Sequence, residues 1–350
     1  MLNMIRCAAP GARARAMQSA FLTLEEWKHL AEMNSTGEVL SWLTRKKIIS
    51  SDTIGSIEAE KEIRESIILC AEKLIHFSYG KLRQLLAFFI YHFDLLNIEA
   101  MIRHIHEVPE AKPVQPDSLY DTGIYGLVDI NQLSAATNFA VLEQMLTRTM
   151  FSNPLAYALE LYTESGDVSA ITTELEVAFL ENWLRAADEC ESLLSADPRS
   201  GDNVFRAFLG FTVIRSILRI LFCRQGDRKA ARKFLSILLQ DPELRNCMTA
   251  IEGMSAEETY YHLASLFFSP KLYKQISEIS FDLNNLDFHF RKFLAEIASR
   301  QKLRAGIGIE FLLSFNFIKT LEVQNLIYII ESRDLGLNPE QTLNYLAGVA

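Results

Sequence analysis

Apolar residues recur along this chain at the spacing of helices, most clearly in the stretch 306–350. There the pattern predicts one long helix, buried along a wide face. Gly336 predicts its end, and Asn338 and Pro339, with Gln341 behind them, predict a short second helix with an N-cap and a capping box. The apolar positions of the long helix are Phe311, Phe315, Ile318, Leu321, Leu326, Ile329 and Ile330.

The same periodicity occurs in earlier parts of the chain, so we expect an all-α protein. In the stretch 57–74, Ile63, Ile67, Cys70 and Leu74 step by four, three and four positions, which places them on one helix face. No long alternating run bounded by hairpin dipeptides predicts a strand pair.

Three features of the sequence recur in the same order, which predicts one helical unit of about 115 residues used three times. A leucine-rich first part recurs, in which Leu43-Thr44-Arg45 matches Leu146-Thr147-Arg148 and Leu263 matches Leu146. In each copy an acid then opens the intervening helix. These acids are either a feature of the repeat or no more than the acids that the helix dipole favours at any helix start. The acids are Glu60, Glu174 and Asp287, and the long helices align through Ile98, Ile102 and Ile105 with Ile214, Leu218 and Leu221 and with Val323, Ile327 and Ile330.

This register predicts three helical units, at 1–108, 109–225 and 226–350. A proline-rich joint at 107–123 excludes a continuous helix between the first two. Further breaks are expected at 197–203 and 225–227. Three similar units predict a pseudo-threefold or curved arrangement, because repeated units often pack through similar faces.

Composition limits the possible functions. Of 350 residues 49% are apolar, which is ample for packed cores, and the formal net charge of −9 disfavours nucleic-acid binding and a polybasic membrane anchor. No run reaches the roughly 18–20 uncharged apolar residues of a membrane span. The best candidate is 207–222, which is short and carries Arg215 and Arg219, so we expect a soluble protein. The arginine-containing N-terminus predicts a first helix of the mature chain in preference to a transit peptide, because Pro10 and Gly11 lie inside it.

Five cysteines, odd in number and widely spaced, predict free thiols in a reducing compartment. They are Cys7, Cys70, Cys190, Cys223 and Cys247.

The histidines and the glycine motifs of this sequence do not have the spacing of a metal-binding, catalytic or nucleotide-binding site. His104 and His106 lie two apart, about 200° apart on a helix, so they cannot form a one-face zinc pair and are expected to be solvated or capping. His92 and His289 lie beside aromatic residues and are expected at helix boundaries or half-buried. Nucleophile-elbow, Walker and dinucleotide glycine motifs are missing, and Gly306-Ile307-Gly308 is only a fragment of the last.

Two charged groups are candidate sites. A row of acids can be a carboxylate site or a solvated helix face, and the second interpretation is favoured. A basic cluster can meet an acidic partner or form an ordinary charged surface, and again the second is favoured. We therefore expect no enzyme, and no catalytic, cofactor-binding or metal-binding residue. The acids are Glu58, Glu62 and Glu65, and the basic residues are Arg224, Arg228, Lys229, Arg232 and Lys233.

Three stretches resemble the C subunit of bacterial and archaeal V-type ATPases, which is called the d subunit in eukaryotes. The first is 11–23, GARARAMQSAFLT, with an Arg-x-Arg-Ala opening. The second is 93–103, FDLLNIEAMIR, with an Asp-x-x-Asn-apolar helix. The third is 321–346, with a Glu-x-x-Asn-Leu helix, a Gly-apolar turn and a Pro-Glu terminal helix.

The match has two departures. Gly210 and Val213 replace the Asp-x-x-Asn pair in the middle unit, and Met4-Ile5-Arg6-Cys7 replaces the aromatic residues before the opening arginine. The chain is thus identified as a divergent bacterial member of the C-subunit family of V-type and A-type ATPases.

The resemblance implies a funnel-like helical protein of three pseudo-threefold-related units. Such a protein sits on the cytoplasmic face of the proteolipid ring, peripheral on the inner face of the plasma membrane, and receives the central stalk. It couples shaft rotation to ion transport, of protons or sodium, without binding nucleotide. Because an acidic socket attracts a basic shaft tip, we also expect an acidic funnel interior.

Two other functions remain open. One is a helical-repeat scaffold with a peptide groove, which predicts repeats of about 34–45 residues. The other is an enzyme whose site is assembled from scattered acids and histidines.

Overall fold

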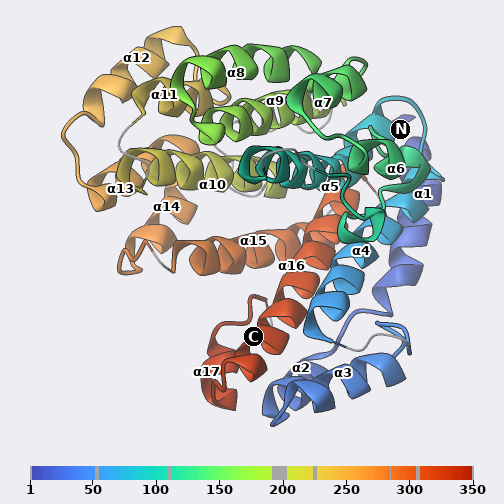
Figure 1. The fold of residues 1–350 in the computed structure, drawn as a ribbon. Helices are drawn as coiled ribbons and strands as arrows, with labels where there is room; N and C mark the ends of the chain where they lie inside the picture. The colour runs from blue at the N-terminus through green and yellow to red at the C-terminus, as the bar shows by residue number, and fades with distance from the viewer. Residues whose placement is uncertain are drawn as a thin grey trace. The chain divides into compact units, whose positions relative to one another are not determined.

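A computed structural model describes residues 2–51, 55–108, 112–190, 203–223, 227–283, 285–304 and 308–348, without the side chains of residues 2–5, 223 and 304. Every regular element in these ranges is helical, which confirms the predicted all-α class. The chain folds into two compact units (Figure 1), described separately below. Unit 1 contains Met1–Tyr79, Asp202–Phe205 and Asn284–Ala350, and unit 2 contains Gly80–Gly201 and Arg206–Leu283. The three sequential units stay a prediction.

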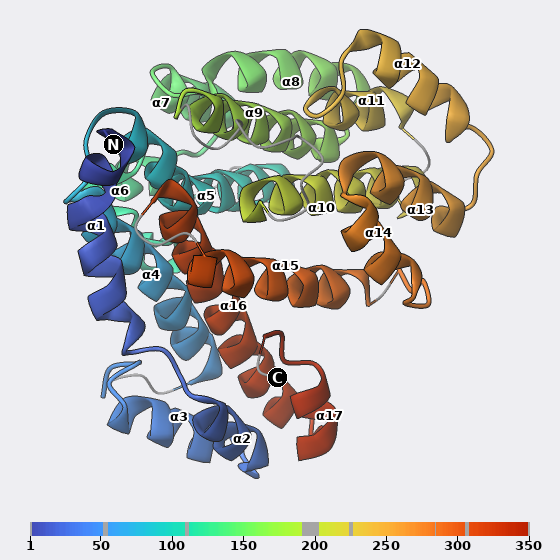
Figure 2. The ribbon, with the colours of Figure 1, turned by 180° about the vertical axis from the view of Figure 1, so that it is seen from behind.

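Unit 1 is built around one long helix, α16, which packs against α1, α3, α4, α15 and α17. In Figure 1, α4 and α16 lie side by side with α2, α3 and α17 at one end of the pair, and Figure 2 shows α1 alongside them from behind. The chain's two ends therefore share one core. The helices are α1 (Leu2–Gln18), α2 (Leu24–Glu32), α3 (Thr36–Arg45), α4 (Ser56–Ile75), α15 (Leu286–Arg304), α16 (Ile309–Asp334) and α17 (Pro339–Asn344).

The predicted C-terminal pattern is confirmed, with one difference. Gly336 has a φ of +69°, the left-handed conformation that ends a helix, and the Asn338–Gln341 capping box opens α17. Instead of one wide face, α16 is buried on nearly all sides, because five helices pack against it. Ile318, expected in the core, is half-buried.

Unit 2 is built around α9, which packs against α5, α8 and α11. Trp183 on α9 lies in an aromatic core: its ring stacks on that of Phe88 with centroids 5.9 Å apart and contacts those of Phe89, Phe179 and Phe208. The helices are α5 (Gly80–Glu107), α6 (Ile130–Ser134), α7 (Phe139–Leu146), α8 (Ser152–Ser165), α9 (Val168–Asp188), α10 (Val204–Leu218), α11 (Arg228–Ser236), α12 (Asp241–Ala250), α13 (Ala256–Phe267) and α14 (Pro270–Ser277), with short turns η1 (Pro116–Ser118), η2 (Gly123–Tyr125) and the π-helical η3 (Arg219–Cys223).

The most membrane-like segment is α5, not the stretch 207–222 named above. Among the described helices, α5 alone is long and apolar enough to cross a membrane by length and composition, and 72% of its most apolar window is buried inside the protein. Core helices of globular proteins meet the same criteria. Sequence reasoning did not single out α5 as an apolar segment. The buried residues of α5 lie on all sides of the helix.

The predicted breaks and helix starts are met in part. Helix α5 ends at Glu107, and Pro116 begins η1 inside the proline-rich joint. Residues 109–111, 197–202 and 224–226 lie outside the described residues.

Of the three acids expected to open helices, Asp287 lies in the first turn of α15, whereas Glu58, not Glu60, lies in the first turn of α4. The first turn of α9 holds no acid, because Glu174 lies further along the helix.

The first helix is confirmed, with Pro10 inside α1. The matched apolar triplets of the predicted repeat lie on α5, on α10 with η3, and on α16. The first and third triplets thus lie on the longest helices of their predicted units, whereas in the second unit α9 is longer than α10.

Candidate functional site

The histidines considered as ligands take separate structural roles. His104 Nε2 lies 2.8 Å from the Lys112 carbonyl oxygen, and His106 Nδ1 lies 2.9 Å from the Tyr162 hydroxyl. His289 is half-buried near the start of α15. His92 lies exposed in the middle of α5 instead of at a helix boundary. Within the described ranges, no three His, Cys, Asp or Glu residues are grouped to hold a metal ion.

The acid row on α4 does not form one site. Glu62 accepts a hydrogen bond of 2.7 Å from the Ser50 amide, and Glu65 lies 3.5 Å from Lys61. Glu58 lies at the exposed N-terminal turn of α4. The carboxylates therefore serve different neighbours and, of the solvated face that the favoured interpretation expects, Glu58 is exposed whereas Glu62 and Glu65 are half-buried.

The basic cluster is partly paired within unit 2. Arg228 on α11 lies 2.6 Å from Glu252, and Lys233 pairs with Glu174 on α9. Lys229 is exposed beside them, as is Arg232. Arg224 lies outside the described residues, as do Gly306 and Ile307, while Gly308 is the N-cap of α16.

The cysteines whose side chains are described are free thiols in the protein interior, as the spacing predicts. Burial raises the pKa of the Cys7, Cys70 and Cys247 thiols to about 11, so they are protonated and unreactive at neutral pH. The free, buried residues are Cys7, Cys70, Cys190 and Cys247.

Two buried polar residues on α5 hold the loop that follows this helix, and we call Asp94 and Asn97 the α5 clamp. The Thr122 hydroxyl and the Leu127 amide each donate a hydrogen bond of 2.7 Å to the Asp94 carboxylate. Asn97 donates to the Tyr120 carbonyl and accepts from the Tyr120 amide, both at 2.8 Å. The 119–127 loop is therefore fixed to the helix through its own backbone.

The α5 clamp lies in a tightly packed, water-poor place. Asp94 is 1% exposed and Thr122 is 2% exposed. A Cβ added at Gly126 would lie 2.2 Å from the Thr122 hydroxyl oxygen and 3.2 Å from an Asp94 oxygen, so the loop approaches α5 closely only with glycine there. Burial raises the pKa of the Asp94 carboxyl to about 6, although both hydrogen bonds oppose this rise.

A second pair, Glu322 and Asn325 on α16, forms an equivalent α16 clamp in unit 1. Asn325 donates to the Ala347 carbonyl at 2.8 Å and accepts from the Ala347 amide at 3.0 Å. Glu322 accepts a hydrogen bond from the Leu22 amide and lies 3.3 Å from Lys319. Each clamp thus combines an acid that holds an interhelical loop with an Asn that bonds both the amide and the carbonyl of one residue.

Both clamp acids bond a residue shortly before a capped helix. Leu22 precedes Thr23, the N-cap of α2, and Leu127 lies two residues before Asp129, the N-cap of α6. The clamps therefore set where α2 and α6 begin. Sequence reasoning found Asp94, Asn97, Glu322 and Asn325 only as parts of family motifs. In the sequence, each pair could have been noticed as an acid and an Asn three residues apart within an apolar stretch of a long helix.

The long helix α10 has an apolar contact where the other two have polar clamps. Gly210 lies against the ring of Phe268, since a Cβ there would come within 2.7 Å of that ring. The neighbouring Phe211 contacts the same ring, with centroids 4.5 Å apart. Phe268 lies at the end of α13, so α10 also fixes the end of another helix, here by aromatic packing.

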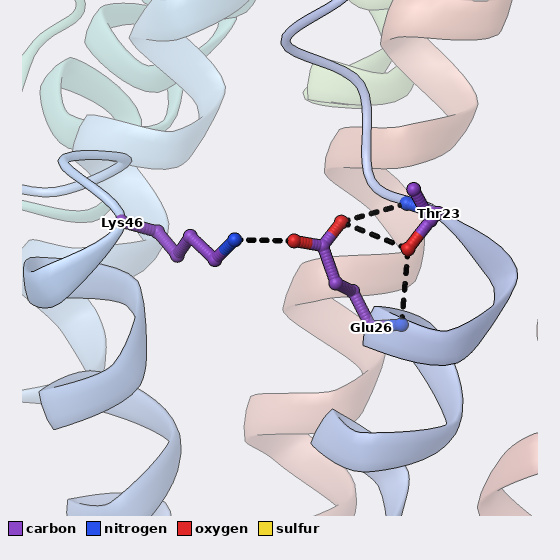
Figure 3. A network of polar contacts seen from close by, with 3 residues as sticks. All are labelled: Thr23, Glu26 and Lys46. Atoms are coloured by element: carbon purple, nitrogen blue, oxygen red, sulfur yellow. Dashed lines mark hydrogen bonds and ion pairs between the residues drawn. The ribbon is translucent and has the colours of Figure 1, made fainter.

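The entry of α2 is reinforced by a polar network beyond the clamp (Figure 3). The Thr23 hydroxyl accepts from the Glu26 amide at 3.3 Å, and Glu26 accepts from the Thr23 amide at 2.8 Å, which completes a capping box. The other oxygen of Glu26 pairs with Lys46, which follows α3. The contact with Lys46, followed by the bond from the Thr23 amide, lowers the pKa of the Glu26 carboxyl. One acid thus joins the start of α2 to the end of α3.

An acidic region lies where α4 and α16 meet. Burial raises the pKa of the Glu60 carboxyl, and the negative charges of Glu331 and Asp334 raise it further, against the effect of Arg64. Asp334 also accepts a hydrogen bond of 2.5 Å from the Thr36 hydroxyl on α3. This region brings carboxylates from two helices of unit 1 together.

Comparison with known proteins identifies the family. The sequence profile described as ATP synthase (C/AC39) subunit matches residues 10–345. The chain is 22% identical over 340 residues to the C subunit of the A-type ATP synthase of Haloferax volcanii, and 20% identical over 341 residues to that of Halorubrum lacusprofundi. Each match covers 94% of this chain and 94% of the relative.

The family expected from the three sequence stretches is thereby confirmed, and with it a non-catalytic place in a V-type or A-type complex. The chain belongs to the ATP synthase (C/AC39) subunit family.

Proposed function

We propose that this protein couples the central stalk of a rotary ATPase to its membrane proteolipid ring. Its work is mechanical: it transmits shaft rotation to the ring, so that ATP hydrolysis or synthesis is linked to transport of protons or sodium. The observation that carries the proposal is the family match over residues 10–345, with relatives of matching extent. Its partners are the stalk subunits and the cytoplasmic face of the ring, and it is peripheral on the inner face of the plasma membrane.

The clamps support a rigid coupling element. A part that transmits torque has to resist bending where its helices connect. Buried hydrogen bonds from a long helix to the next loop provide such resistance, because breaking them leaves buried backbone groups unpaired. The α5 and α16 clamps fix two such connections, and the Phe268 contact on α10 fixes a third.

The clamps also support the predicted pseudo-threefold arrangement. Helix α5, from the first predicted unit, holds the entry to α6 in the second. Helix α16, from the third, holds the entry to α2 in the first. A long helix that serves the next unit, with the last serving the first, is the connectivity of a closed ring of three.

Co-purification tests the proposed partners. The chain carries an affinity tag and is purified from detergent-solubilised membranes of its source, with an untagged strain as control. Mass spectrometry is expected to find a proteolipid and the central-stalk subunits in the tagged sample alone. Recovery of soluble partners only would contradict the coupling role and favour the helical scaffold.

A further inference from the structure

The 119–127 loop is anchored by a carboxyl group, that of Asp94, without a cation beside it in the described part of the chain. Asp94 accepts hydrogen bonds from Thr122 and Leu127, and no ion pair of Asp94 occurs among the residues that the structure describes. The equivalent acid of the α16 clamp, Glu322, has Lys319 at 3.3 Å. A buried carboxylate without a counter-charge is costly, so its charge state and its burial are linked.

The other charged groups near Asp94 are few and do not neutralise it. On α5, the negative charge of Asp94 contributes, after burial, to raising the pKa of the Tyr91 hydroxyl, and Arg83 lies over the Tyr125 ring with 5.1 Å to its centroid. In the loop, Asp121 is exposed and accepts from the Gly123 amide. From α6, the N-cap Asp129 bonds its own helix, and α9 presents the rings of Phe179 and Trp183 to α5.

The loop also carries the most exposed large apolar side chain described. Ile124 is 89% exposed at the centre of η2, between the clamped residues Thr122 and Leu127. The clamp therefore determines whether this side chain is presented in a fixed place. Opening the clamp would free the segment and bring water to Asp94.

We propose that the 119–127 loop is a proton-linked latch: protonation of Asp94 holds it closed against α5, and ionisation favours its release. In the neutral state the carboxyl O–H donates to the Thr122 hydroxyl oxygen, and the other carboxyl oxygen still accepts from the Leu127 amide. Closing takes up one proton from solvent, and opening returns it. No other group has to change its charge.

The direction of the effect follows from linkage. The closed loop has an Asp94 pKa of about 6, whereas the open loop exposes the carboxyl to water, where its pKa returns toward 3.8. Below about pH 4 both states are protonated and closure is at its strongest. As the pH rises from about 4 through about 6 the closed state loses this advantage, and above about 6 opening is about 100-fold more frequent than below about 4.

Amide hydrogen exchange on the purified full chain at about pH 5 and about pH 7.5 tests the latch, with rates corrected for intrinsic exchange. In the wild type we expect protection of the 119–127 amides to fall about 10-fold between the two values. Asp94→Asn, which keeps the size and one acceptor, is expected to make this protection independent of pH. Glu322→Gln, in the other clamp, is the matched control and should leave the dependence at 119–127 unchanged.

The wild type alone can overturn the proposal. Equal corrected protection of the loop at both pH values, with the rest of unit 2 still protected, would contradict a proton-linked latch whatever the variants do. A pH dependence that persists in Asp94→Asn would assign the effect to another group and likewise overturn the latch. Both results are independent of the rotary role, because the measurement uses the isolated chain.

Discussion

At the scale of single residues, Asp94, Asn97, Glu322 and Asn325 show how polar groups are accommodated inside long apolar helices. Each is buried, and each bonds to backbone groups of a loop that would otherwise lie unpaired against the helix. An Asn is suited to this because its side-chain amide can donate to the carbonyl and accept from the N–H of one residue. Such residues position neighbouring elements.

Replacing Asn97 by Ala is expected to destabilise the protein by about 2–4 kcal/mol. The change removes two hydrogen bonds and leaves the amide and the carbonyl of the half-buried Tyr120 without these partners. Chemical denaturation of the purified chain measures the cost. Asn344→Ala, at an exposed position of α17, is the control and should change stability by less than about 0.5 kcal/mol. Equal stability of the two variants would contradict the clamp.

Gly126→Ala and Gly37→Ala form a matched pair with opposite expected signs. A methyl group at Gly126 meets the Thr122 hydroxyl oxygen at 2.2 Å, whereas one at Gly37 meets nothing within 4 Å. We expect Gly126→Ala to destabilise by about 1–3 kcal/mol, and Gly37→Ala, in the first turn of α3, to be neutral or stabilising by up to about 1 kcal/mol. Thermal unfolding of both variants checks the contrast. A stable Gly126→Ala protein would show that the loop need not lie this close to α5.

At the scale of elements, helix starts determine how the short helices of unit 1 are held. Helix α2 is fixed three times: by the Thr23 capping box, by the Glu26–Lys46 pair and by the Glu322 bond to Leu22. The pair is partly exposed to solvent and adds little by itself. The cap and the buried bond therefore supply most of the restraint.

Thr23→Ala is expected to lower stability by about 1 kcal/mol, with increased amide exchange confined to α2. The change removes the hydroxyl that accepts from the Glu26 amide, while the α16 clamp keeps Leu22 in place. Thr163→Ala serves as the control, since its exposed hydroxyl bonds only within α8. Uniform loss of protection across unit 1 would show that the cap has a wider role than this account gives it.

Particular elements also show how far sequence alone could lead. The turn at Gly336 and the cap at Asn338–Gln341 are predictable because caps act between residues close in the chain. Periodicity places Ile63, Ile67 and Leu74 correctly in the core. The partner of Asn97 lies 23 residues away in a loop without periodicity, so no local pattern could predict it. The near-complete burial of α16 escapes prediction for the same reason, because it depends on which helices pack around it.

At the scale of the whole molecule, the proposed socket for the stalk is expected to be acidic. Glu331→Lys combined with Asp334→Lys reverses two exposed charges of the region at Glu60. We expect recovery of the central-stalk subunits in the co-purification to fall several-fold and to fall more at low salt, where charge interactions are strongest. Glu340→Lys, exposed on α17, is the matched control. Unchanged recovery with the double variant would reject an acidic docking region in unit 1.

Coupling in membrane vesicles tests the central claim most directly. ATP hydrolysis and ATP-driven ion transport are measured together in vesicles from cells that lack this chain, before and after the purified chain is added back. A mechanical coupling role predicts that hydrolysis persists without the chain while transport is lost, and that addition restores transport. Transport that continues undiminished in its absence would contradict the account.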